Sequence, residues 1–160
     1  MTNAALYRKV LGHFATGVTI VTVANGRGGI EGFTASAFSA LSLEPPLVLV
    51  CLAQDSECYE PLRREGHYAI HFLSEQQTTL AYAFADRNLD KSKQTDWGFN
   101  ERGYAILRDA LAVIECRLQR EYLGGDHAIF VGEVEAMEIM DGTMKPLLYF
   151  RGQLGGSEIF

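Results

Sequence analysis

Two kinds of hydrophobic spacing alternate along the chain, and the first predicts a helix near the N-terminus. From Ala4 to Ala15, apolar side chains recur every three or four residues, which predicts an amphipathic helix with Asn3 as its cap, ended by Gly17. Its apolar stripe consists of Leu6, Tyr7, Val10, Leu11 and Phe14. The β-branched run "GVTIVTV" and the segment "IEGFTA" then flank the turn "ANGRGG", a pattern that predicts a β-hairpin.

The middle of the chain consists of short elements with clear boundaries. Residues 47–52 are apolar at every position, as expected for a strand buried on both faces. Pro61 and Gly66 fit the first turn and the end of a short helix over 60–65. The strand "HYAIHFL" follows, and Ser74 with Gln77 forms a capping box for a helix that runs to Phe84 or Ala85.

The last third combines a polar segment with long strands. Residues 86–103 are polar apart from Trp97 and Phe99, which predicts a long surface loop of the kind that forms lids or binding loops. Residues 112–119 alternate between apolar and polar positions, and the strands "AIFVGEVEAMEIM" and "PLLYF" follow. Six or seven strands with three helices predict a mostly β fold with flanking helices, built on an antiparallel, barrel-like sheet.

Composition and charge favour a single globular domain and argue against nucleic-acid-binding and membrane-spanning proteins. A chain of 160 residues with 48% hydrophobic residues fits one globular domain over 1–160. The net charge of −6, without a basic stripe, argues against nucleic acid as a partner. No apolar run is long enough to cross a membrane, and no signal-peptide pattern is present, so we expect a cytoplasmic protein. Cys51, Cys58 and Cys116 suggest neither a disulfide framework nor a zinc site.

Familiar catalytic motifs are missing from the sequence. It contains no G-x-S-x-G elbow, no phosphate-binding G-x-x-x-x-G-K-[ST] loop and no G-x-G-x-x-G fingerprint. His67 and His71 have the i, i+4 spacing of a metal pair, but in a strand that spacing separates them by roughly 13 Å. We therefore expect no shared metal, and a surface position for His13.

The stretch "FTASAFS" is the best candidate for a ligand surface. Thr34, Ser36 and Ser39 offer hydroxyl groups, and the alanines between them allow a ligand to approach the backbone. Such a turn can hold carbonyl and phosphate oxygens and would suit a planar heterocycle that carries a phosphate. The same residues fit a serine-rich loop that satisfies only its own backbone, and their types alone leave both interpretations open.

Five stretches carry a resemblance to a known family: "HFATGVTIVTV", "GFTASAFSALSLEPPLVLVCL", "LSEQQTTLAYAFA", "GGDHAIFVGEVE" and "PLLYFRG". From about Leu6 to Gly152 the chain resembles the short-chain flavin reductases, the reductase components of two-component flavin-dependent monooxygenases. The resemblance implies an antiparallel split β-barrel FMN-binding fold, a homodimer, and FMN or FAD held without a Rossmann domain. It also implies hydride transfer from NADH or NADPH, and transient release of reduced flavin to a partner monooxygenase.

The resemblance also implies site residues, in four groups. The isoalloxazine is lined by Thr34, Ala35, Ser36 and Ala37. The surface that continues around the ring and reaches the phosphate is formed by Cys51, Leu52, Ala53, Gln54, Asp55 and Ser56. The ribityl-phosphate side is formed by Phe84 and Arg87. The catalytic residue beside the nicotinamide is His127, with Tyr149, Phe150, Arg151 and Gly152 near the same pocket.

One feature departs from what a phosphate needs. The turn "AQDSECYEP" contains no Lys or Arg, and Asp55 has the wrong charge, so backbone donors or Arg87 would have to compensate. The segment 86–103 is a candidate lid and a candidate determinant of FMN against FAD. Two other functions stay open: a flavin-binding electron carrier that does not turn over NAD(P)H, and a non-enzymatic module acting through protein contacts.

Overall fold

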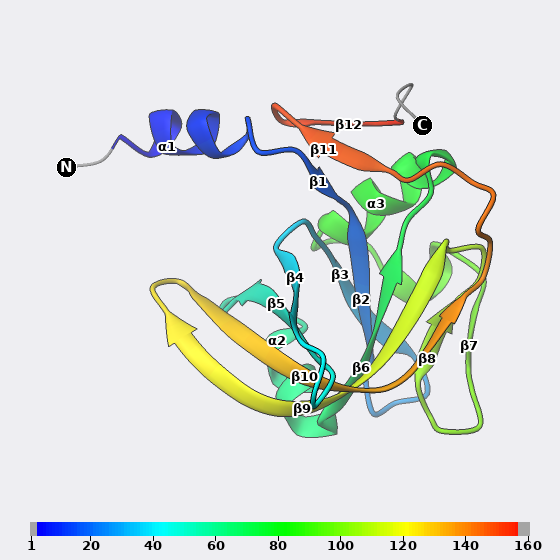
Figure 1. Cartoon of the computed structure of the whole chain (residues 1–160). Coiled ribbons are helices and arrows are strands. Elements are labelled where there is room, and N and C mark those ends of the chain that lie inside the picture. Colours follow the sequence, from blue (N-terminus) through cyan, green and yellow to red (C-terminus); the bar gives the residue numbers. More distant parts are fainter. Residues whose placement is uncertain (1–2, 157–160) are drawn as a thin grey trace.

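The computed structural model describes residues 3–156, and its centre is a seven-stranded antiparallel sheet in the order β3-β2-β6-β9-β10-β5-β4 (Figure 1). These strands are β2 (Thr19–Ala24), β3 (Ile30–Ala35), β4 (Phe38–Ser42), β5 (Leu47–Ala53), β6 (His67–Phe72), β9 (Ala112–Gly124) and β10 (His127–Ile139). Smaller sheets contain β1 (Thr16–Gly17), β11 (Leu148–Phe150) and β12 (Gln153–Gly155), and separately β7 (Trp97–Phe99) and β8 (Ala105–Leu107). The helices are α1 (Ala4–Leu11), α2 (Tyr59–Glu65), α3 (Thr78–Ala85) and the 3₁₀ turns η1 (Glu75–Gln77) and η2 (Lys91–Lys93).

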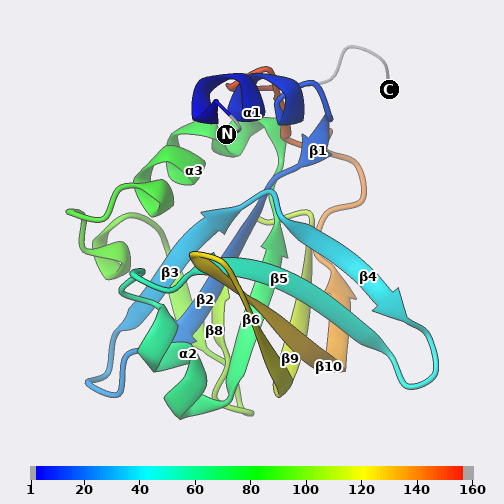
Figure 2. The same ribbon diagram turned by 90° about the vertical axis from the view of Figure 1, so that its left-hand side faces the viewer.

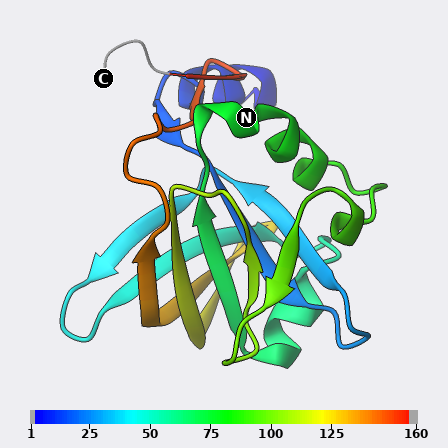
Figure 3. The same ribbon diagram turned by 90° about the vertical axis from the view of Figure 1, so that its right-hand side faces the viewer.

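Strand β2 is buried on both faces because each face packs against a different core. Val21 and Val23 belong to the core that α2 covers through Leu62, whereas Ile20 belongs to a second core with Phe84 of α3. This arrangement explains the continuous β-branched run that the sequence shows here. It also fixes α2 and α3 on opposite sides of the strand (Figure 3).

The large sheet curls strongly but does not close. Strands β3 and β4 are its two edges, although only Ser36 and Ala37 separate them in the chain. At this point the Cys51 N–H of β5 donates to Ala37 O at 3.0 Å. The sheet is therefore split beside the "TASA" segment, and Figure 2 shows β3 diverging from β4 and β5 there.

The predicted mostly β, antiparallel fold is confirmed, but several boundaries differ. Helix α1 ends at Leu11, capped by Gly12, and Gly17 lies in β1. Strand β4 was not predicted, because its Ser and Ala residues are typical of a loop. Strand β5 is buried on one face only: Val48, Val50 and Leu52 are buried, and the residues between them are half-buried.

The apolar stripe of α1 does not pack into the body of the chain. Leu6, Tyr7, Val10, Leu11 and Phe14 are all more than half exposed, Phe14 at 76%. Figure 1 shows the helix projecting from the upper edge of the molecule. Asn3 Oδ1 accepts from the Ala5 N–H at 2.9 Å, so the predicted cap is present. None of the helices in residues 3–156 combines the length and apolar character needed to span a membrane.

The segment 86–103 is more ordered than a surface loop, so that prediction is wrong in part. It contains η2 and β7, and β7 pairs with β8. The Trp97 Nε1–H donates to Ser92 O at 3.0 Å, and its ring packs against the second core. A role of this segment as a lid stays a prediction.

His71 is fully buried in β6 and both of its ring nitrogens are used. Nδ1 lies 3.2 Å from Ile20 O and Nε2 accepts from the Leu107 N–H at 3.0 Å. These bonds fix the tautomer with the proton on Nδ1, which leaves neither nitrogen for a metal. Burial lowers the pKa of His71 from 6.5 to about 4.

This burial predicts a pH dependence of stability. Between pH 6.5 and 4 the unfolded chain protonates His71 and the folded chain does not, so the free energy of unfolding falls as pH falls through this range. The full difference is about 3 kcal/mol from a shift of this size. Denaturant unfolding at several pH values should show this slope, and His71→Gln should flatten it. An equal slope in the variant would contradict the assignment.

Candidate functional site

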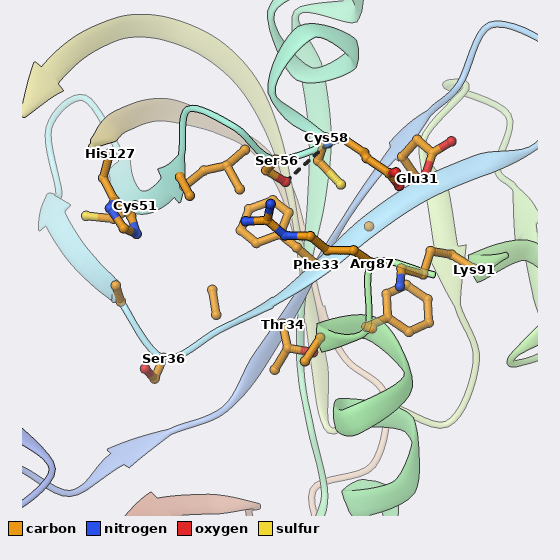
Figure 4. Close-up of a pocket in the computed structure, with 18 residues that line it drawn as sticks. Glu31, Phe33, Thr34, Ser36, Cys51, Ser56, Cys58, Arg87, Lys91 and His127 are labelled. Atoms are coloured by element: carbon orange, nitrogen blue, oxygen red, sulfur yellow. Dashed lines mark hydrogen bonds between the residues drawn. The ribbon is translucent and has the colours of Figure 1, made fainter. Parts of the chain in front are cut away.

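A cavity of about 320 Å³ lies at the split in the sheet (Figure 4). Its walls come from β3, the link to β4, the end of β5 with the turn into α2, the end of α3, and the start of β10. The residues that line it are Glu31, Gly32, Phe33, Thr34, Ala35, Ser36, Ala37, Cys51, Leu52, Ala53, Ser56, Glu57, Cys58, Phe84, Ala85, Arg87, Lys91 and His127.

One wall of the cavity is made of small side chains, and hydrogen bonds to neighbouring elements hold its backbone and Thr34 in place. Thr34 Oγ1 donates to Ala81 O of α3 at 2.6 Å, and Thr19 Oγ1 donates to Ala35 O at 2.8 Å. The Thr34 hydroxyl proton is therefore used within the protein. Ser36 is exposed to the cavity, whereas Ser39 faces a neighbouring groove, so the three hydroxyls do not form one cluster.

Gly32 allows α3 to approach this wall closely. A Cβ at Gly32 would lie 2.6 Å from the ring of Phe84 and 2.9 Å from Val21 O, so any side chain here would displace Phe84 or the backbone. Phe84 is almost fully buried and forms part of the cavity lining. The glycine thus sets the position of the aromatic wall.

Arg87 is the cation that extends into the cavity, beside Ser56 in Figure 4. Its two terminal nitrogens donate to the two carboxylate oxygens of Asp55 at 3.0 and 2.9 Å. These bonds hold the pKa of Asp55 below its ordinary value. Asp55 does not line the cavity itself; it belongs to the turn after β5 and contacts the site through Arg87.

Lys91 is a second cation that the sequence analysis did not identify. It is only 4% exposed, and its Nζ donates to Asp86 O and, at 2.9 Å, to Ala83 O, carbonyls at the end of α3. Among the described residues it has no carboxylate partner. Nothing in the local pattern distinguishes Lys91 from the neighbouring Lys93, because its burial depends on how the polar segment folds.

The same end of the cavity contains carboxylates. Burial, with Glu57 nearby, raises the pKa of Glu31. Burial raises the pKa of the adjacent Cys58 thiol to about 12, so this cysteine stays protonated. The alternation of "IEGFTA" could have indicated Glu31 and Phe33, which share a face of β3 with Ala35.

His127 lies at the opposite end, close to Cys51 in Figure 4. Its Nδ1 is 2.7 Å from Asp126 Oδ1, so the carboxylate accepts the Nδ1 proton and Nε2 remains for a ligand. Gln54 does not line the cavity as predicted. Its Nε2 donates to Gly125 O and His127 O, both at 3.0 Å, which ties the β9–β10 turn to the end of β5.

The C-terminal group of predicted site residues lies elsewhere. Tyr149, Arg151 and Gly152 line a separate hollow beside α1, and the Phe150 ring contacts the guanidinium of Arg151. Tyr149 also lines an apolar groove of about 1000 Å³ that shares Ser36, Ala37 and Cys51 with the cavity. None of these four residues lines the cavity within one chain, and their role beside the nicotinamide stays a prediction.

The sequence model for the flavin reductase like domain matches residues 11–158. The chain belongs to this family. It is 40% identical over 153 residues to the flavin-dependent monooxygenase reductase subunit HsaB of Rhodococcus jostii, covering 95% of this chain and 77% of that protein. It is 39% identical over 153 residues to the FMN reductase (NADH) SmoA of Agrobacterium fabrum, covering 96% and 86%.

A solved structure agrees with this assignment. The NADH:FAD oxidoreductase SgcE6 of Streptomyces globisporus, in complex with NAD and FAD fragments, superimposes with a TM-score of 0.91 at 34% identity, covering 98% of this chain and 94% of that one. The family predicted from the sequence is therefore confirmed.

The residues of the cavity fit a flavin. The side chains from Thr34 to Ala37 are small enough to leave room for a planar ring, and Arg87 offers a cation that could pair with a phosphate. Phe84 and Phe33 supply apolar contacts. The cavity combines small and aromatic walls with polar and charged side chains.

Proposed function

We propose that this chain is an NAD(P)H:flavin oxidoreductase that reduces FMN or FAD and supplies the reduced flavin to a separate monooxygenase. The observation that carries the proposal is the cavity itself, with a small-residue wall, a cation at one end and His127 at the other. The names of the relatives, which include an FMN reductase and a monooxygenase reductase subunit, support it. A cytoplasmic location stays a prediction.

The protein contributes positioning and electrostatics. The flavin, when bound, supplies the redox chemistry by accepting a hydride from the nicotinamide. The wall Thr34–Ala37 would hold the flavin ring, and Arg87 would bind its phosphate. His127 is oriented by Asp126, and its free Nε2 would accept a hydrogen bond from the carboxamide N–H of a nicotinamide. No nucleophile is required, consistent with the missing catalytic motifs.

An anaerobic mixing experiment tests this function. Protein, FMN and NADH are combined without oxygen, and the absorbance of oxidised flavin is followed against a mixture without protein. We expect the protein to accelerate the loss of this absorbance strongly. Flavin that binds but stays oxidised would indicate an electron carrier, and flavin that does not bind would indicate a non-enzymatic module.

The exposed stripe of α1 supports a homodimer as part of the same proposal. The stripe borders the apolar groove of about 1000 Å³, to which Tyr7, Leu11 and Phe14 contribute. An apolar surface of this extent is typical of an interface between subunits. The groove adjoins the cavity, so a second copy of the chain would also cover the cavity's open side near Ser36.

Phe14→Glu should convert the dimer to a monomer. The change places a charge in the proposed interface, and buried unpaired charges are costly. Sedimentation velocity would measure the state, with Leu43→Glu as a control because Leu43 is 84% exposed and lies outside the groove. A dimer that persists in Phe14→Glu, or an unaltered chain that is monomeric, would rule out this interface.

A further inference from the structure

We propose that Asp55 competes with the flavin phosphate for Arg87 and thereby keeps the flavin exchangeable. This inference rests on the proposed function and makes it more specific: Asp55 sets how tightly Arg87 holds the flavin phosphate. Asp55 acts through Arg87 and is therefore a positioning residue.

The first step is the geometry of the pair. Arg87 meets Asp55 in a two-pronged arrangement, with distances of 3.0 and 2.9 Å, and Asp55 O lies 3.5 Å from the same guanidinium. A phosphate that binds Arg87 in the two-pronged manner would use the same Nη1 and Nη2 fork. The Asp55 carboxylate occupies that fork, so such a phosphate displaces it.

The second step is the shortage of other cations at this end of the cavity. Lys91 commits its ammonium group to the carbonyls of Ala83 and Asp86. Glu31 and Glu57 line the same region and add negative charge. Arg87 therefore supplies most of the attraction for a phosphate. Because the Arg87 guanidinium also pairs with Asp55, that pairing lowers the affinity for FMN.

The ion pair between Arg87 and Asp55 is exposed to solvent. The side chains of Arg87 and Asp55 are 58% and 74% exposed, so their pairing is readily broken and remade. Exposed ion pairs contribute modestly to stability. The pair thus suits a reversible competition, and its removal should leave the fold unaffected.

The test is Asp55→Asn, with FMN and riboflavin as probes. Riboflavin has the same ring and ribityl chain without the phosphate. We expect Asp55→Asn to tighten FMN binding by roughly threefold to tenfold at low salt and to leave the dissociation constant of riboflavin unchanged. Asp126→Asn is the matched control, since Asp126 is also exposed and paired, but with His127 at the other end.

A second variant separates competition from direct repulsion of the phosphate. In an Arg87→Gln background, the effect of Asp55→Asn should disappear, because no cation remains to be released. FMN affinity that is unchanged or weaker in Asp55→Asn, or a gain that persists without Arg87, would overturn the inference. If the unaltered chain bound neither FMN nor riboflavin, the proposed function would fail, and the inference with it.

Discussion

Replacing Ser36 with tyrosine should abolish flavin binding while the chain stays folded. Ser36 lies on the small-residue wall of the cavity, exposed, beside Ala35 and Ala37. A phenol ring at this position would occupy the space that the flavin ring needs, in a cavity of about 320 Å³. We expect the dissociation constant of FMN to rise by roughly 100-fold or more, equal to about 2.7 kcal/mol.

Two measurements make this result interpretable. Ser36→Ala keeps the space and removes the hydroxyl, so FMN affinity should stay close to that of the unaltered chain. The far-UV circular dichroism of Ser36→Tyr should match that of the unaltered chain, because Ser36 belongs to no hydrophobic core of the described residues. Unchanged FMN affinity in Ser36→Tyr would show that the flavin does not lie on this wall.

The second large effect is expected for His127→Ala, and it should appear in the use of NADH. Nε2 of His127 lies at the end of the cavity away from Arg87, oriented through the bond between Nδ1 and Asp126. Its loss removes the Nε2 lone pair, a hydrogen-bond acceptor for the carboxamide N–H of a nicotinamide docked at this end of the cavity. We expect kcat/KM for NADH to fall by roughly 10- to 100-fold, with little change in FMN affinity.

A purely structural role for His127 predicts a different result. Its side chain is 50% exposed and makes no contact with the core, so its removal should not change the unfolding temperature. Asp126→Asn should give a smaller fall in kcat/KM, because the ring keeps its place but loses its orienting partner. Normal NADH kinetics in His127→Ala would remove the residue from the site.

The resemblance of five stretches predicted the family and its site residues, whereas local residue patterns predicted the antiparallel strands. The hairpin at "ANGRGG" and the cap at Asn3 are examples: each follows from residues adjacent in the chain. Most of the predicted site residues line one cavity: Thr34–Ala37, Cys51–Ala53, Ser56, Phe84, Arg87 and His127.

The features that the sequence did not predict depend on contacts between distant parts of the chain. The burial of Lys91 arises from the folding of the polar segment against the end of α3, which no spacing encodes. Gln54 looked like a cavity residue and instead holds the β9–β10 turn, because the side chain reaches a turn 71 residues away in sequence. The amphipathic character of α1 was predicted, but within residues 3–156 its apolar stripe stays exposed, which the spacing alone does not indicate.

The most direct test of the central claim is the rate of NADH oxidation as a function of added flavin. The purified chain is mixed with NADH in oxygenated solution, and NADH absorbance is followed at increasing concentrations of FMN and, separately, FAD. The account predicts a rate that rises and saturates with flavin, and that is lost in Ser36→Tyr. A rate that is no higher than in protein-free mixtures at every flavin concentration would contradict it.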